Sequence, residues 1–115
     1  MAILKKLARK YFDAFSNKNI TKLSDMFSDK VILRDWEVLA VGKKKVVAAT
    51  ENILNSVNTI NIKPLELYEE RNTIVAELEI IINGKEKELI VDVITFNGDN
   101  KITNIRAYKC PLQKE

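Results

Sequence analysis

Several residue types are missing or scarce in this chain of 115 residues, and each absence excludes a class of chemistry. Histidine is absent, which excludes His-based acid–base catalysis, Ser-His-Asp triads and most zinc sites. The single cysteine, Cys110, permits no internal disulfide, which agrees with a reducing cytoplasm. Glycine and proline are few, and the sequence contains no low-complexity run or repeat.

Long hydrophobic runs are also missing. No apolar stretch approaches the roughly 20 residues that a membrane-spanning helix needs. Residues 1–10 lack the long apolar core and the small-residue cleavage site of a signal peptide. We therefore expect a soluble, cytoplasmic protein that has no membrane partner.

Charge of one sign is in only slight excess, with a formal net charge of +3. The basic residues gather in two short runs, within Lys5–Lys10 and at Lys43–Lys45. Neither run has interleaved aromatic residues or belongs to a broad basic face, so no nucleic-acid partner is expected. Hydrophobic residues make up 46% and charged residues 30% of the chain, which is typical of a soluble globular protein. Residues 1–115 are long enough for one domain with a real core, but not for two.

Three segments have the apolar spacing of amphipathic helices. Residues 2–17 carry an apolar stripe that includes Tyr11, so the ring of this tyrosine should face inward. Asn19 fits the N-cap of a short second helix through Leu23 and Phe27. A third helix is expected at about residues 43–57.

The remaining segments alternate as β-strands do. Residues 30–35 predict one strand, and residues 36–41 either continue it or turn back along it. Further strands are expected from residue 59 to 68, with Pro64 at an edge or a bulge, and at 73–82, 88–96 and 101–109. Asn83-Gly84 and residues 97–100 predict hairpin turns. This order predicts an α+β fold, in which three helices pack on one face of a curved, mostly antiparallel sheet and leave a cavity.

Asp92 stands out because it lies at the centre of a strand face that is otherwise apolar, with Ile90, Ile94 and Phe96. Burying a bare charge there is costly, so the carboxyl must be paired or kept neutral by a raised pKa. A salt bridge to Arg34 or Arg106 is the structural alternative. A neutral carboxyl would instead be able to donate a hydrogen bond.

Two further residues could face the same cavity. Tyr11 lies on the inner stripe of the first helix, although such tyrosines are often packing residues whose hydroxyl bonds to the backbone. Asp35 ends the first strand, where it could equally be an exposed turn residue.

Three motifs in this sequence resemble those of the NTF2-like (SnoaL-like) superfamily, and within it the Δ5-3-ketosteroid isomerases. The segment Arg9–Phe15 is similar to the first-helix motif with the catalytic tyrosine. The segment Phe27–Asp35 resembles the strand that ends in the general-base aspartate, and Val91–Gly98 resembles the strand with the protonated aspartate. The similarity extends over nearly the whole chain.

This resemblance implies a cone-shaped NTF2-like fold and a cofactor-free proton transfer α to a carbonyl. Asp35 would be the base, and Tyr11 and a neutral Asp92 would donate hydrogen bonds to the developing oxyanion. It also implies an apolar small-molecule substrate and a homodimer formed through the outer face of the sheet. The expected pocket-lining residues are Phe15, Trp36, Thr50, Leu54, Ile90 and Ile94.

The sequence departs from the isomerase pattern at three places. Trp36 follows the base where proline is favoured, Thr50 replaces a supporting tyrosine of some relatives, and residues 106–109 are more polar than a steroid site would require. Two alternatives therefore stay open. One is a SnoaL-like polyketide cyclase, and the other is a non-catalytic module that binds a small molecule or a protein.

Overall fold

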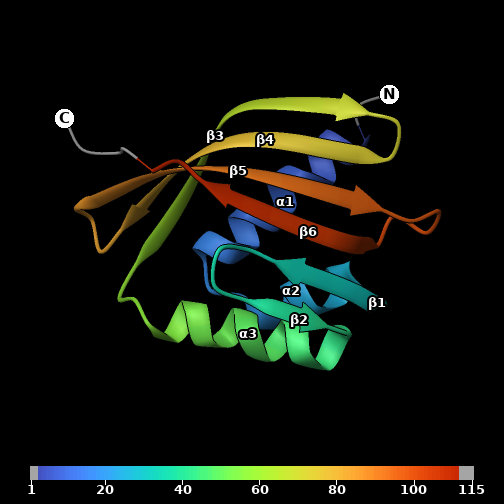
Figure 1. Cartoon of the computed structure of the whole chain (residues 1–115), viewed down its shortest axis with the longest axis horizontal. Helices are drawn as coiled ribbons and strands as arrows, with labels where there is room; N and C mark the ends of the chain where they lie inside the picture. Colours follow the sequence, from blue (N-terminus) through green and yellow to red (C-terminus); the bar gives the residue numbers. More distant parts are fainter. Residues whose placement is uncertain (1–2, 112–115) are drawn as a thin grey trace.

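The computed structural model describes residues 3–111, which form three helices and six strands (Figure 1). The elements in chain order are α1 (Ile3–Ser16), α2 (Ile20–Met26), β1 (Phe27–Arg34), β2 (Leu39–Val41), α3 (Lys43–Asn55), β3 (Ile60–Glu70), β4 (Thr73–Ile82), β5 (Glu86–Phe96) and β6 (Ile102–Lys109).

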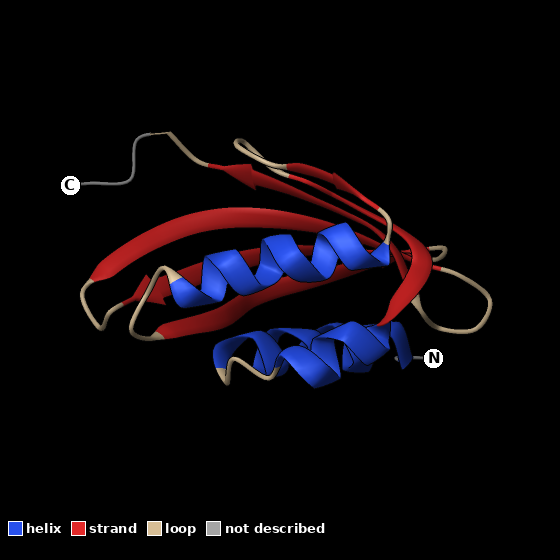
Figure 2. Cartoon of the chain, turned by 90° about the horizontal axis from the view of Figure 1, so that it is seen from below, coloured by secondary structure: helices blue, strands red, loops and turns tan. Residues whose placement is uncertain are grey.

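The strands form one sheet in the order β2-β1-β6-β5-β4-β3. All neighbours pair antiparallel except β1 and β6, which run parallel. The sheet bends, and the helices gather on its concave side (Figure 2). This arrangement confirms the predicted α+β fold with helices on one face of a mostly antiparallel curved sheet.

The helices form where their apolar stripes predict them, and they bury those stripes. In α1 the buried residues are Leu4, Ala8, Tyr11, Phe12 and Ala14. The side chain of Asn19 caps α2 by accepting a hydrogen bond from the backbone N–H of Lys22 at 3.2 Å. Phe27 was expected in this helix, but it is the first residue of β1 and is buried there. None of the helices within residues 3–111 is long and apolar enough to cross a membrane.

The segment after β1 turns back, which settles the alternative that the sequence left open. The backbone N–H of Asp35 donates to the carbonyl of Val38 at 2.9 Å, and β2 then pairs antiparallel with β1. Pro64 lies in β3 at the edge of the sheet, and the register of β3 against β4 shifts between Pro64 and Glu66. Both the edge position and the irregularity expected for this proline are confirmed.

Asn83 joins the β4–β5 hairpin to the segment that leads into β3. It adopts a left-handed backbone (φ 55°), as does Gly84 (φ 72°), which the tight turn requires. Its side-chain Oδ1 accepts hydrogen bonds from the backbone N–H groups of Asn58 at 2.7 Å and Thr59 at 3.1 Å. The hairpin therefore fixes the beginning of β3, the strand that supplies one wall of the cavity described below.

We expect Asn83→Ala to lower the free energy of unfolding by about 1–3 kcal/mol, because two backbone N–H groups lose their acceptor. Asn100 is a matched control, since it has the same left-handed backbone (φ 62°) but no side-chain hydrogen bond to a residue in the range 3–111. Asn100→Ala should lower the free energy of unfolding by only about 1 kcal/mol, because alanine is less favourable than asparagine in the left-handed backbone conformation. Urea denaturation of both variants measures the difference, and equal losses would contradict the anchoring role.

Candidate active site

A cavity of about 350 Å³ opens between the concave face of the sheet, α1, α3 and the β1–β2 turn. Most of its wall is apolar. The hydrophobic lining residues are Phe15, Leu33, Trp36, Val38, Ile53, Val57, Ile60, Ile62, Ile80, Ile82, Ile90, Ile105 and Ala107. A cavity of this size and character suits a compact apolar molecule.

The three predicted catalytic residues, Tyr11, Asp35 and Asp92, all line this one cavity. They come from the middle of α1, the turn after β1 and the middle of β5. The fold therefore brings together a phenol and two carboxyl groups that are far apart in the sequence. Tyr11 and Asp92 are buried, whereas Asp35 is half-buried.

Asp92 is buried, with 8% of its surface exposed. Its neighbours across the sheet are Ala76 on β4 and Ala107 on β6, so neither side supplies a polar partner. The alternative of a salt bridge to Arg34 or Arg106 is not realised, since no ion pair within residues 3–111 involves Asp92. Burial, and secondly the charge of Asp35, raise the pKa of Asp92 from 3.8 to about 7.

Tyr11 is held by an aromatic cluster. Its ring centroid lies 5.5 Å from that of Phe12, 5.9 Å from that of Phe15 and 6.3 Å from that of Phe27. Burial, and secondly the charge of Asp92, raise the pKa of the Tyr11 phenol well above its ordinary value, so the hydroxyl keeps its proton. It thus remains a hydrogen-bond donor at neutral pH.

The polar ends of Tyr11 and Asp92 face open space in the cavity. No fully enclosed side-chain nitrogen or oxygen in the described part of the chain lacks a hydrogen-bond partner. Tyr11 and Asp92 make no side-chain hydrogen bond to a described residue, so their oxygens must be reachable from the cavity. The expected alternative for Tyr11, a hydroxyl bonded to the backbone, is not found among these residues.

Asp35 is both a turn residue and a cavity residue, so both interpretations of the sequence apply. Its Oδ1 accepts hydrogen bonds from the backbone N–H groups of Glu37 at 2.8 Å and Val38 at 2.7 Å. These bonds fix the orientation of the carboxylate where it lines the cavity. One oxygen is committed to the turn, and the other is left for a ligand.

Four of the six expected pocket-lining residues contribute to the wall: Phe15, Trp36, Thr50 and Ile90. The hydroxyl of Thr50 donates to the carbonyl of Val46 at 2.8 Å, so it is satisfied within α3. Leu54 and Ile94 are not lining residues, and this part of the prediction is wrong.

Leu54 and Ile94 do not line the cavity because both belong to the packed core beside it. Ile94 is fully buried and pairs with Ile74, which is also fully buried, so along β5 the cavity ends between Asp92 and Ile94. Ile53 on α3 and Val57 just after this helix line the cavity, whereas Leu54 on α3 is buried in the core. The isoleucines of β3 and the end of β4 were missed as wall residues, although their alternation already placed Ile80 and Ile82 on the inner face.

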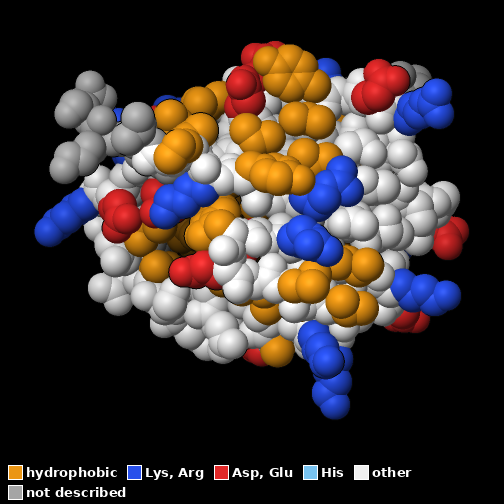
Figure 3. Space-filling model, viewed as in Figure 1, with side chains coloured by type: hydrophobic (Ala, Val, Ile, Leu, Met, Phe, Trp, Pro, Cys, Tyr) orange, Lys and Arg blue, Asp and Glu red, His pale blue; other side chains and the backbone are white. Residues whose placement is uncertain are grey.

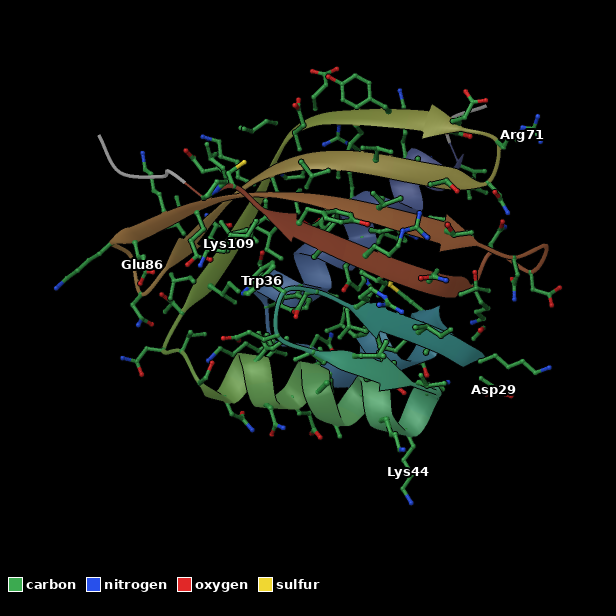
Figure 4. All side chains as sticks on the ribbon, in the orientation of Figure 1. Asp29, Trp36, Lys44, Arg71, Glu86 and Lys109 are labelled. Atoms are coloured by element: carbon green, nitrogen blue, oxygen red, sulfur yellow. The ribbon has the colours of Figure 1, made fainter. Side chains whose placement is uncertain are left out.

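Charged residues and Trp36 form the rim of the cavity. The Lys109 Nζ lies 3.1 Å from Glu88 Oε2 and 5.5 Å from the centroid of the Trp36 ring. Trp36 is 47% exposed, so it stands at the mouth and does not fill the cavity. Figure 4 shows Trp36 and Lys109 near the same end of the sheet, where β1 turns away from β6.

A family model of the SnoaL-like domain matches residues 8–105. The chain therefore belongs to the SnoaL-like family, and its fold is NTF2-like. No curated protein matches the sequence.

Solved structures with the same fold are similar over nearly the whole chain. A provisionally assigned SnoaL-like polyketide cyclase from Shewanella denitrificans OS-217 gives a TM-score of 0.85 at 14% identity, covering 96% of this chain and 92% of that chain. A provisionally assigned ketosteroid isomerase from Kribbella flavida DSM 17836 gives 0.83 at 12% identity, with coverages of 97% and 81%. An NTF2-like protein of unknown function from Cytophaga hutchinsonii ATCC 33406 gives 0.79 at 14% identity, with coverages of 94% and 90%. At these identities the likeness establishes the fold alone.

The raised pKa of Asp92 makes the stability of the protein depend on pH. Between pH 3.8 and about 7 the unfolded chain has released this proton while the folded chain retains it, so the contribution of Asp92 to stability falls as the pH rises through this window. The variant Asp92→Asn mimics the neutral acid and has no such pH dependence at this position. Its free energy of unfolding, relative to that of wild type, should therefore rise by up to about 4 kcal/mol between pH 3 and pH 8. Urea denaturation across this range measures the difference, and a constant offset between the two proteins would contradict the raised pKa.

Proposed function

We propose that this protein is an isomerase of the ketosteroid isomerase type, which moves a double bond by cofactor-free proton transfer α to a carbonyl. The observation that supports this proposal is the convergence of Tyr11, Asp35 and Asp92 on one apolar cavity of about 350 Å³. Two of these groups keep a proton at neutral or mildly acidic pH, and the third is a carboxylate held in place by its turn.

Each residue has a defined part in the proton transfer. The Asp35 carboxylate removes a proton from the carbon α to the ketone, and the electron pair moves onto the carbonyl oxygen. The Tyr11 hydroxyl and the neutral Asp92 carboxyl donate hydrogen bonds to this oxyanion. Asp35 then returns the proton to the far end of the dienolate, which completes the shift and regenerates the carboxylate.

The wall of the cavity defines the substrate class for this reaction. Isoleucines from β3, β4, β5 and β6 surround the site. Apart from the three proposed catalytic groups and the charged rim, the polar lining residues are Thr50 and Ser56, whose hydroxyls donate to backbone carbonyls of α3. We infer a compact β,γ-unsaturated ketone as substrate, with its carbonyl oxygen between Tyr11 and Asp92. The low dielectric of such a site strengthens both hydrogen bonds to the oxyanion.

The second candidate is a polyketide cyclase, which the likeness to proteins named for that activity favours. The same base would form an enolate, whose carbon would attack a second carbonyl of the same molecule, and the same donors would stabilise the oxyanion. A non-catalytic binding module is the third candidate. It shares the cavity with the other two, but does not need a base at Asp35.

Isomerisation of a β,γ- to an α,β-unsaturated ketone, followed by ultraviolet absorbance, tests the proposal. Asp35→Asn should lower kcat by about 10²–10⁴-fold because the base is lost, while the remaining amide oxygen can still accept the turn hydrogen bonds. Tyr11→Phe and Asp92→Ala should each lower kcat by about 10²–10³-fold because one oxyanion donor is lost. The substrates are a steroid ketone and a smaller cyclic ketone.

Asp29→Asn is the matched control for Asp35→Asn. Asp29 lies on β1, the strand that leads into Asp35, but Figure 4 shows it at the opposite end of this strand from Trp36, so this variant should keep wild-type turnover. Equal activity of wild type and Asp35→Asn would contradict the assignment of the base. If neither ketone turns over but both bind with wild-type folding intact, the non-catalytic module becomes the better description.

We further propose that the protein forms a homodimer through the part of the uncovered sheet face that β3, β4 and β5 form; Figure 3 shows this face with apolar side chains among charged ones. Val75 on β4 pairs directly with Val93 on β5, and Tyr68 and Leu89 on this face are largely exposed. Sedimentation velocity should give twice the mass of one chain. Val93→Glu should give a monomer, whereas Ile3→Glu, at an exposed isoleucine of α1 on the helix side of the sheet, should leave the dimer intact. A wild-type monomer would contradict this proposal.

A further inference from the structure

The sheet has a gap beside the candidate active site. Strands β1 and β6 pair in parallel as far as Arg34 and Arg106. Beyond this pair β6 continues to Lys109, while β1 leaves the sheet at Asp35 and turns back into β2. Trp36 and Lys109 stand across the gap from each other, joined by the cation–π contact.

A second hollow of about 280 Å³ lies at this gap. Asp35, Trp36, Ala107 and Lys109 line both this hollow and the catalytic cavity, so the two adjoin. The residues that belong to the second hollow alone are Arg34, Arg106 and Tyr108, and we call it the outer groove. These three alternate with cavity-lining residues along their strands, so they lie on the uncovered face of the sheet.

The two arginines of the outer groove are like charges placed side by side. They are direct partners on neighbouring strands, where like charges are unfavourable. The ion pairs found within residues 3–111 are Lys87 with Glu79 and Lys109 with Glu88, so neither arginine has a carboxylate partner there. Figure 3 shows basic side chains on this face between apolar areas.

We propose that the outer groove binds an anionic group, a phosphate or a carboxylate, of a ligand whose apolar part occupies the catalytic cavity. Guanidinium groups match such oxyanions with paired N–H donors, and the two adjacent arginines offer more donors than one anion needs. Tyr108, 56% exposed, adds a hydroxyl at the same place. To reach from the cavity to the outer groove, the ligand would replace the contact between Trp36 and Lys109.

This inference rests on the proposed function only in so far as the ligand is the substrate. It then narrows the substrate class to an apolar unsaturated ketone that carries an acidic group at the end remote from the reacting carbons. Of the nearby acidic residues, Asp35 lines the outer groove as well as the cavity, and its Oδ1 accepts hydrogen bonds from the backbone N–H groups of Glu37 and Val38. Glu37 and Glu88 do not line the outer groove, and Glu88 is paired with Lys109.

Trp36 provides the readout, because it is the only tryptophan in the chain and lines both spaces. The probes are a cyclohexylpropanol, the matching cyclohexylpropanoate and cyclohexylpropyl phosphate, none of which absorbs where tryptophan is excited. Their dissociation constants are measured from Trp36 emission and repeated by calorimetry. Both acidic probes should bind about tenfold more tightly than the alcohol at low salt, and this preference should shrink as salt rises.

The double variant Arg34→Gln/Arg106→Gln should bring all three dissociation constants within about twofold of one another. Arg71→Gln is the matched control, because Arg71 is exposed in the β3–β4 turn, far from Trp36 in Figure 4. It should keep the full preference for the acidic probes. A preference for one acidic probe alone identifies that anion as the ligand group.

Equal binding of the alcohol and both acidic probes by wild type would overturn the proposal. A double variant that keeps the preference for the acidic probes would also overturn it. If that variant becomes a monomer in sedimentation and still keeps the preference, the arginines serve self-association instead. These binding measurements need no turnover, so they test the anion site in the outer groove independently of the isomerase assay. Turnover without any anion preference would leave the proposed function intact and remove the groove.

Discussion

A carboxyl group buried without a counter-ion is the constraint on which the rest of the site depends. Asp92 lies in the middle of β5, between two alanines of neighbouring strands, with no described cation beside it. In such surroundings the charged form is unfavourable, so the group holds its proton up to a pH of about 7. The cavity is what makes this burial tolerable, because the carboxyl can still donate its proton into open space or to a ligand.

The two aspartates of the cavity carry the same chemical group but have opposite surroundings. Asp35 belongs to a turn whose backbone N–H groups bond to its Oδ1, whereas Asp92 faces isoleucines and alanines. The charge on Asp35 also raises the pKa of Asp92, so ionisation of one favours protonation of the other. Environments that separate two carboxyl groups in this way allow one to act as a base and the other as a donor.

The sequence predicted the parts of this structure that depend on local patterns. The alternation over residues 73–82 gave β4 with its bounds, and the buried stripe of α1 gave the inward direction of Tyr11. Features that depend on how elements meet could not be predicted. Whether residues 36–41 turn back depends on backbone hydrogen bonds at Asp35, and whether Ile94 or Ile80 faces the cavity depends on where the helices cover the sheet. The period-two pattern assigns both isoleucines to the inner face and does not indicate where the packed core ends.

The end of β1 beside a longer neighbour explains why Asp35, the rim and the outer groove occur together. The strand β6 runs on to Lys109 after β1 has turned away at Asp35. The turn that orients the carboxylate therefore also opens the sheet beside it. Trp36 is the next residue of the turn, and Lys109 is the last residue of β6. Their side chains are in contact across that opening. The position of the Asp35 carboxylate and the opening beside it are thus set by one structural feature, and a change in this turn would alter both.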